Sequence, residues 1–114
     1  MMLYRYEVSL GYKTTGIFHV LTELEKVMEE NATIEEQQEL EDAKYILNRD
    51  LPCIPDFGIS TRTWFTEEGN ARFHEEIQVL VYYINLYLGR LVIRREMSER
   101  WPEEMYEDEY QVVY

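Results

Sequence analysis

The sequence contains few cysteine, proline, glycine and histidine residues, and each shortage narrows the range of folds and chemistries. One cysteine in 114 residues excludes an intrachain disulfide, which suits a reducing, cytoplasmic location. Three prolines and five glycines leave no room for a flexible linker, and the length favours one domain over residues 1–114. With two histidines and one cysteine, we expect neither a metal site nor a cofactor.

The sequence also lacks long hydrophobic runs. Its longest uncharged stretch, residues 77–89, includes Gln78 and Asn85 and is shorter than the roughly 20 apolar residues that cross a bilayer. The first residues lack the basic start and apolar run of a secretory signal. We therefore expect a soluble protein with no membrane partner.

Positive charge is scarce, because 23 acidic residues stand against 11 basic ones and the formal net charge is −12. A chain with this charge repels nucleic acid, so we predict no direct DNA or RNA binding. The acidic residues gather in two segments that are candidates for partner binding. The first holds Glu25, Glu29, Glu30, Glu35, Glu36 and Glu39; the second, residues 103–109, holds Glu103, Glu104, Glu107, Asp108 and Glu109 together with Tyr106.

Hydrophobic spacing predicts a strand followed by a helical hairpin. Residues 3–10 alternate between apolar and polar side chains, which indicates a half-buried strand that ends at Gly11. Apolar residues then recur every three or four positions from Ile17 to Met28, which predicts a helix over residues 15–30. Thr33 and Glu36 have the spacing of a capping box, so a second helix should follow to about residue 49.

The second half of the sequence predicts a strand, a long helix and a final strand. Two prolines make residues 51–55 a loop, and residues 57–65 have a strand composition. Thr66 resembles the cap of a third helix, which we extend to residue 98 because its apolar stripe stays in phase. Gly89 offers an alternative, in which the helix stops and residues 91–97 form a strand. Residues 110–114 resemble a short strand.

These elements predict an α+β fold. About three mainly antiparallel strands would form a small sheet, covered by an acidic helical hairpin and one long apolar helix. The order along the chain would be β-α-α-β-α-β. An all-α fold with short extended ends is the alternative.

Motifs that carry catalysis are scarce in this sequence. His74-Glu75-Glu76 begins like a zinc-protease motif, but position 78 is Gln and the second histidine is lacking. Cys53 lies between two prolines with no base nearby in the sequence, and we interpret it as a small half-buried side chain. His19 lies beside the apolar stripe of the first helix, where we expect partial burial. We therefore predict no catalytic residues and a function in binding.

The leading functional hypothesis is an acidic protein-binding module that occupies a basic groove of its partner. Carboxylates interleaved with tyrosines can imitate a phosphate backbone, so the partner would be an enzyme that processes DNA or RNA and the chain its inhibitor. By analogy of composition alone, small acidic anti-restriction and anti-CRISPR proteins of phages and mobile elements act in this way.

Two alternatives belong to other classes. Arg62 and His74, with a basic strip of Arg90, Arg94 and Arg95, could form an unfamiliar phosphate-binding or small-ligand site, with Arg90 and Arg94 on one helix face. The chain could also be a structural oligomer component. In that case a homodimer would form through the long helix, using Tyr82, Tyr83, Leu86 and Tyr87.

Overall fold

The computed structural model describes residues 2–53, 62–99 and 104–114. The strands in these segments are β1 (Leu3–Ser9), β2 (Thr14–Gly16), β3 (Thr63–Phe65), β4 (Val92–Met97), β5 (Tyr106–Glu107) and β6 (Gln111–Val113). The helices are the 3₁₀ turn η1 (Ile17–Val20), α1 (Leu21–Asn31), α2 (Ile34–Asp50), α3 (Glu67–Arg72), α4 (His74–Tyr83) and the π-helical turn η2 (Ile84–Leu88).

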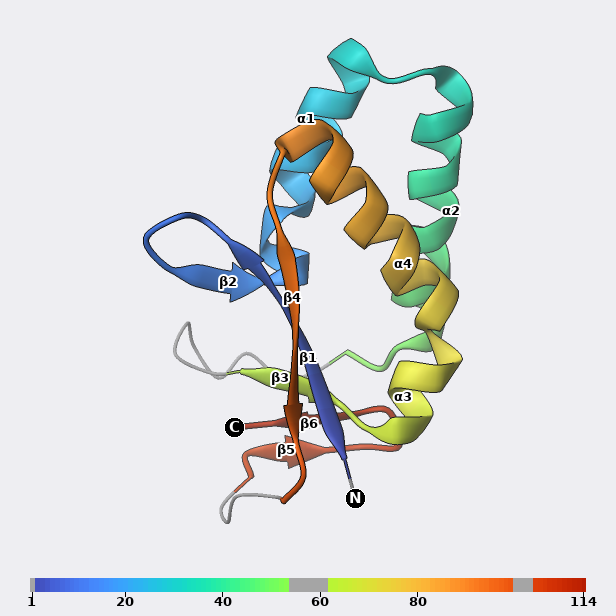
Figure 1. Cartoon of the computed structure of the whole chain (residues 1–114). Coiled ribbons are helices and arrows are strands. Elements are labelled where there is room, and N and C mark those ends of the chain that lie inside the picture. Colours follow the sequence, from blue (N-terminus) through green and yellow to red (C-terminus); the bar gives the residue numbers. More distant parts are fainter. Residues whose placement is uncertain (1, 54–61, 100–103) are drawn as a thin grey trace.

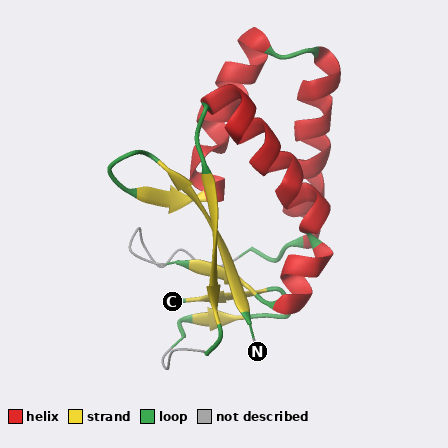
Figure 2. Cartoon of the chain, in the orientation of Figure 1, coloured by secondary structure: helices red, strands yellow, loops and turns green. Residues whose placement is uncertain are grey.

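The described strands form one antiparallel sheet organised around β1. On one edge β1 pairs with β4 from Leu3↔Met97 to Val8↔Val92. On the other edge it pairs with β3 near its start and with β2 near its end. The sheet continues from β3 through β6 to β5. Figures 1 and 2 show α1, α2 and α4 together on one side, with β5 and β6 at the end of the molecule opposite the α1–α2 loop.

Both faces of β1 are covered. Tyr6 and Val8 point into the main core beneath the helices, as the alternation predicts. The prediction of a half-buried strand is wrong, however, because Arg5 and Glu7 on the other face are only 9% and 5% exposed. They are joined in an ion pair between Arg5 Nε and Glu7 Oε2 at 2.8 Å. Beside them a second apolar cluster contains Leu3, Trp64 and Val112. The ion pair therefore compensates the charges that are buried on this face.

The helical hairpin is confirmed, although its first helix begins later than predicted. The segment before Leu21 forms β2 and η1, because Gly11 at φ +91° turns the chain back beside β1. Leu10 N–H donates to the Lys13 carbonyl at 2.8 Å and closes this turn. The capping box at the start of α2 is present, with Thr33 and Glu36 each accepting from the backbone of the other.

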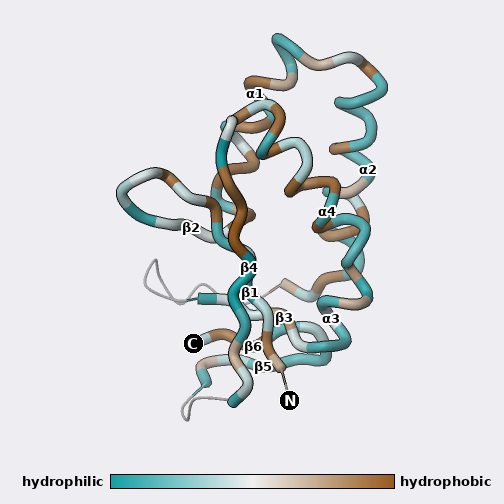
Figure 3. The backbone as a smooth tube through the Cα atoms, viewed as in Figure 1, coloured by the Kyte–Doolittle hydropathy of each residue, from teal (hydrophilic) through white to brown (hydrophobic). Residues whose placement is uncertain are grey.

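The long third helix is a wrong prediction, and the alternative is confirmed. The helical region bends at Phe73 between α3 and α4 and ends at Leu88. Gly89 adopts the left-handed conformation at φ +61°, and its N–H donates to the Asn85 carbonyl at 3.1 Å. The next residues form β4, whose change from hydrophobic to hydrophilic residues is visible in Figure 3. Residues 92–97 therefore pair with β1, although the helical spacing of apolar residues continues across Gly89.

The fold class is therefore confirmed at the level of a mixed α+β chain with an antiparallel sheet. The described residues contribute six strands where about three were predicted, and several helical segments replace the one long apolar helix. The predicted order lacked β2, β4 and β5. Of the strand predicted over residues 57–65, Thr63–Phe65 forms β3, whereas residues 57–61 lie outside the described residues. The final strand is present as β6.

Replacing Gly69 with alanine should destabilise the fold by about 2 kcal/mol, because an added Cβ would lie 2.1 Å from the Tyr110 carbonyl oxygen. This is opposite in sign to the usual effect of Gly→Ala inside a helix, which gains about 1 kcal/mol. Urea unfolding measures the difference. Ala71→Gly is the control in the same helix and should cost no more than about 1 kcal/mol. A Gly69→Ala protein as stable as the parent would disprove this packing.

Candidate functional site

The α1–α2 hairpin directs its acidic side chains outward. Leu24 and Met28 of α1 and Leu40, Ala43 and Leu47 of α2 are buried, so the apolar stripe of each helix faces the core. Acidic residues occupy much of the remaining surface. At the loop end, Glu29, Glu30 and Glu35 are all exposed, and none of them forms an ion pair with another described residue.

Acidic residues further from the loop are partly neutralised. Lys44 Nζ forms ion pairs with Glu25 and Glu41. Arg90, which follows η2, forms an ion pair with Glu23 of α1, in which Nη1 and Oε1 are 2.6 Å apart. The uncompensated negative charge of the hairpin is therefore concentrated towards its loop end.

Tyrosines from the α4 region fix two of the hairpin carboxylates. Tyr87 OH donates to Glu36 Oε1 at 2.6 Å, which raises the pKa of Tyr87 to about 12 and lowers that of Glu36. Burial and a hydrogen bond to Glu39 raise the pKa of Tyr83 to about 12. The rings of Tyr83 and Tyr87 stack with centroids 6.0 Å apart. The ionised Glu36 carboxylate is therefore held beside an aromatic cluster at neutral pH.

Replacing Tyr87 with phenylalanine should raise the pKa of Glu36 towards the ordinary glutamate value. The hydrogen bond from Tyr87 is the largest of the contributions that lower this pKa. NMR titration of the Glu36 carboxyl carbon measures the change. Tyr82→Phe is the matched control, because Tyr82 is exposed and makes no hydrogen bond to Glu36. An unchanged Glu36 titration in Tyr87→Phe would contradict the assigned contact.

A shallow cleft between α2 and α4 carries further negative charge and an exposed ring. Its lining residues are Glu39, His74, Glu75, Gln78, Val79 and Tyr82. Tyr82 is 58% exposed, and its ring packs edge to face with the Tyr83 ring, with centroids 5.1 Å apart. A cation on this ring would have the two glutamates as counter-charges, because Glu39 and Glu75 line the same cleft. This cleft was not predicted from the sequence, although residues 75, 78, 79 and 82 have the spacing of one face of α4.

The described part of the second acidic segment, residues 104–109, lies in β5 and in the turn that leads to β6, at the opposite end of the molecule from the hairpin loop (Figure 1). Asp108 holds this turn, accepting from the N–H groups of Tyr110 and Gln111 at 2.8 and 3.0 Å. Tyr106 OH also donates to Asp108, at 2.8 Å. Glu104, Glu107 and Glu109 are exposed, whereas Glu103 lies outside the described residues. The two acidic segments therefore do not form one surface.

The arginines of the predicted basic strip do not lie on one helix. Arg90 follows η2, while Arg94 and Arg95 are neighbours on β4, so the predicted shared helix face is wrong. Arg95 pairs with Glu7 on one face of the sheet. Arg94 pairs with Glu96 at 2.8 Å and lies over the Tyr4 ring. Arg62 is exposed just before β3. Intramolecular carboxylates thus already pair with Arg90, Arg94 and Arg95.

The remaining polar candidates lie apart from one another. His74 begins α4, whereas His19 is exposed and meets Thr15 Oγ1 through Nδ1 at 2.9 Å, which corrects the expected partial burial. Cys53 is likewise exposed and not half-buried. Over residues 2–53, 62–99 and 104–114, no three histidine, cysteine or acidic side chains converge on a possible metal position. In the same ranges no helix combines the length and apolarity needed to cross a membrane.

Comparison of this chain with protein-family models, with curated protein sequences and with solved structures finds no match in any of the three.

Proposed function

We propose that this chain is a protein-binding module that docks onto a basic groove of a partner. The docking surface is the acidic face, defined as Glu29, Glu30, Glu35, Glu39, Glu75 and Tyr82. The observation that carries the proposal is the cleft between α2 and α4, which is lined by carboxylates from both helices and by an exposed aromatic ring. Glu35 and Glu39 are one helical turn apart on α2, which joins this cleft to the charged loop end.

The two parts of the acidic face contribute different terms to binding. The exposed carboxylates near the loop attract a cationic surface over long range and accelerate association. In the cleft, a lysine or arginine of the partner would stack on Tyr82 between Glu39 and Glu75. Contacts of this kind are desolvated and central, and residues at such positions carry much of the affinity of an interface.

Proteins that bind nucleic acid are the class of partner that fits best. Their grooves hold clustered lysines and arginines that neutralise phosphates, and the acidic face presents carboxylates to the same cations. Occupancy of such a groove would exclude DNA or RNA, so the chain would inhibit its partner by competition. This mode of inhibition requires no catalytic residue in the chain.

The experiment is capture of the partner on the immobilised full chain from an extract of its source cells, followed by measurements on the purified complex. Raising salt from about 50 to 200 mM should weaken the affinity at least about tenfold, because counterions return to both surfaces. Duplex DNA or RNA that the partner binds should displace the chain. A complex that is insensitive to both salt and nucleic acid would contradict the proposal.

A further inference from the structure

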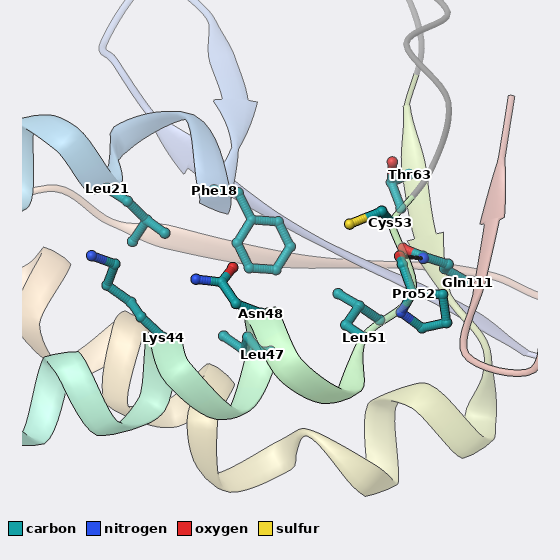
Figure 4. Close-up of a pocket in the computed structure, with 10 residues that line it drawn as sticks. All are labelled: Phe18, Leu21, Lys44, Leu47, Asn48, Leu51, Pro52, Cys53, Thr63 and Gln111. Atoms are coloured by element: carbon teal, nitrogen blue, oxygen red, sulfur yellow. Dashed lines mark hydrogen bonds between the residues drawn. The ribbon is translucent and has the colours of Figure 1, made fainter.

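A cavity of about 300 Å³ lies between the helices and the sheet, away from the acidic face. It is formed by the second half of α2, by residues 18 and 21 beside the α1 start, and by β3 and β6. Its lining is Phe18, Leu21, Lys44, Leu47, Asn48, Leu51, Pro52, Cys53, Thr63 and Gln111. Figure 4 shows Leu21 and Lys44 at one end, Cys53 and Thr63 at the other, and Phe18 between them.

Among the described lining residues, most are apolar and the one charged group is already paired. Lys44 is bound by Glu25 and Glu41. Burial alone would lower the pKa of Lys44, but these carboxylates outweigh burial and raise it, so the ammonium stays charged and paired. An anionic ligand would have to compete with two carboxylates in a chain whose net charge is −12. The charge around the cavity therefore disfavours anions.

Few polar groups remain for a ligand. The Gln111 amide donates to the Pro52 carbonyl at 2.6 Å and to Asp108 Oδ2 at 3.1 Å. The Asn48 amide and the Thr63 hydroxyl have no side-chain hydrogen bond to any described residue. These two groups lie on different walls, one on α2 and one on β3. Apolar walls with a few such groups are typical of a small-molecule site.

We propose that this cavity binds a small, neutral, flat and mainly apolar molecule with one hydrogen-bonding group. The volume sets the size, because a cavity of about 150 Å³ accommodates one benzene ring, so this one has room for two fused rings. Phe18 offers a ring edge or face to such a ligand, while Asn48 or Thr63 hydrogen-bonds its polar group. The site is independent of the proposed docking function, since none of its lining residues belongs to the acidic face.

Cys53 provides a direct test, because it lines the cavity and is the only cysteine of the chain. The rate at which iodoacetamide alkylates the full chain therefore reports on this site alone. We expect 2-naphthamide at millimolar concentration to slow alkylation at least threefold and to raise Tm. The isosteric anion 2-naphthoate should have a markedly smaller effect. Equal protection by both compounds would overturn the neutral ligand class.

Two variants locate the effect in the cavity. Leu21→Trp adds an indole at a partly buried position at one end and should abolish protection by 2-naphthamide. Asn48→Ala, at an exposed helical position, should weaken protection without challenging the fold. Tyr45→Ala is the control on the same helix, outside the lining, and should keep protection intact. Absence of protection and of amide NMR shifts in the parent chain would disprove the site.

Discussion

Reversing Glu29, Glu30 and Glu35 to lysine together should weaken partner binding by at least about 100-fold. Each reversal removes an attraction and adds a repulsion against a basic groove, and 100-fold corresponds to only about 2.7 kcal/mol over three sites. The fold should persist, because these side chains are exposed and form no described ion pair. Glu36 is left unchanged, since it caps α2 and accepts the Tyr87 hydroxyl. Calorimetric titration against the captured partner measures the affinity.

A matched control separates local docking from net charge. Glu99, Glu104 and Glu109 are exposed, and their reversal to lysine changes the total charge by the same amount. Positions 104 and 109 lie at the β5–β6 end of the molecule, opposite the hairpin loop (Figure 1). We expect this control to lower the affinity less than tenfold, through weaker long-range attraction. Equal losses in the two triple variants would refute a localised docking face.

Replacing Glu7 with glutamine should destabilise the fold by about 3 kcal/mol at pH 7. Glu7 accepts hydrogen bonds from Arg5, from Arg95 and from the Thr14 hydroxyl. Neutralising Glu7 leaves the guanidinium of Arg5, which is 9% exposed, without its counter-charge. Removing one partner of a buried ion pair strongly destabilises a fold. Urea unfolding measures the loss, and Glu96→Gln is the control. Glu96 pairs with Arg94 at an exposed position, so the Glu96→Gln substitution should cost less than about 1 kcal/mol.

The same carboxylate should make stability depend on pH. Burial alone would raise the pKa of Glu7, but its hydrogen bonds and charge contacts with Arg5 and Arg95 outweigh burial and lower it. Its contribution is therefore complete above the unfolded glutamate value of about 4.3 and is lost as pH falls through the lower folded value. The destabilisation by Glu7→Gln should thus shrink on acidification. A difference that stays constant between about pH 7 and pH 2.5 would exclude this linkage.

The sequence predicts those parts of the fold whose signals are local. The capping box of Thr33 and Glu36, the cap at Thr66 and the strand β1 each depend on residues within a few positions of one another, and all three are present. The burial of Arg5 and Glu7 was not predictable, because it depends on Arg95 and on β3. A polar side of a strand resembles a solvated face until its distant partners are known.

The third helix illustrates how a correct periodicity can give a wrong element. Leu91 and Val92 continue the apolar stripe across Gly89, so the pattern alone does not reveal the turn. What ends the helix is the left-handed glycine together with the hydrogen bonds that β4 makes with β1, more than 80 residues away in the chain. Non-local strand pairing of this kind overrides a local helical preference.

The candidate site was predictable only in part, for the same reason. Composition indicates an acidic hairpin, and the structure exposes its loop-end carboxylates. The cleft requires α2 and α4 to lie side by side, which no local pattern specifies. The basic strip was predicted wrongly because the helix that would have carried it ends at Leu88. Two of its arginines form long-range ion pairs, Arg90 with Glu23 and Arg95 with Glu7.

Amide hydrogen exchange of the chain, free and bound to its captured partner, tests the acidic face most directly. Protection on binding should appear at the hairpin loop and along the outer face of α4, in residues 29–39 and 74–82. The β5–β6 turn and β4 should exchange as they do in the free chain. Protection confined to β4, β5 and β6, with an unchanged hairpin loop and α4, would show that the partner binds elsewhere and that the acidic face is only solvated surface.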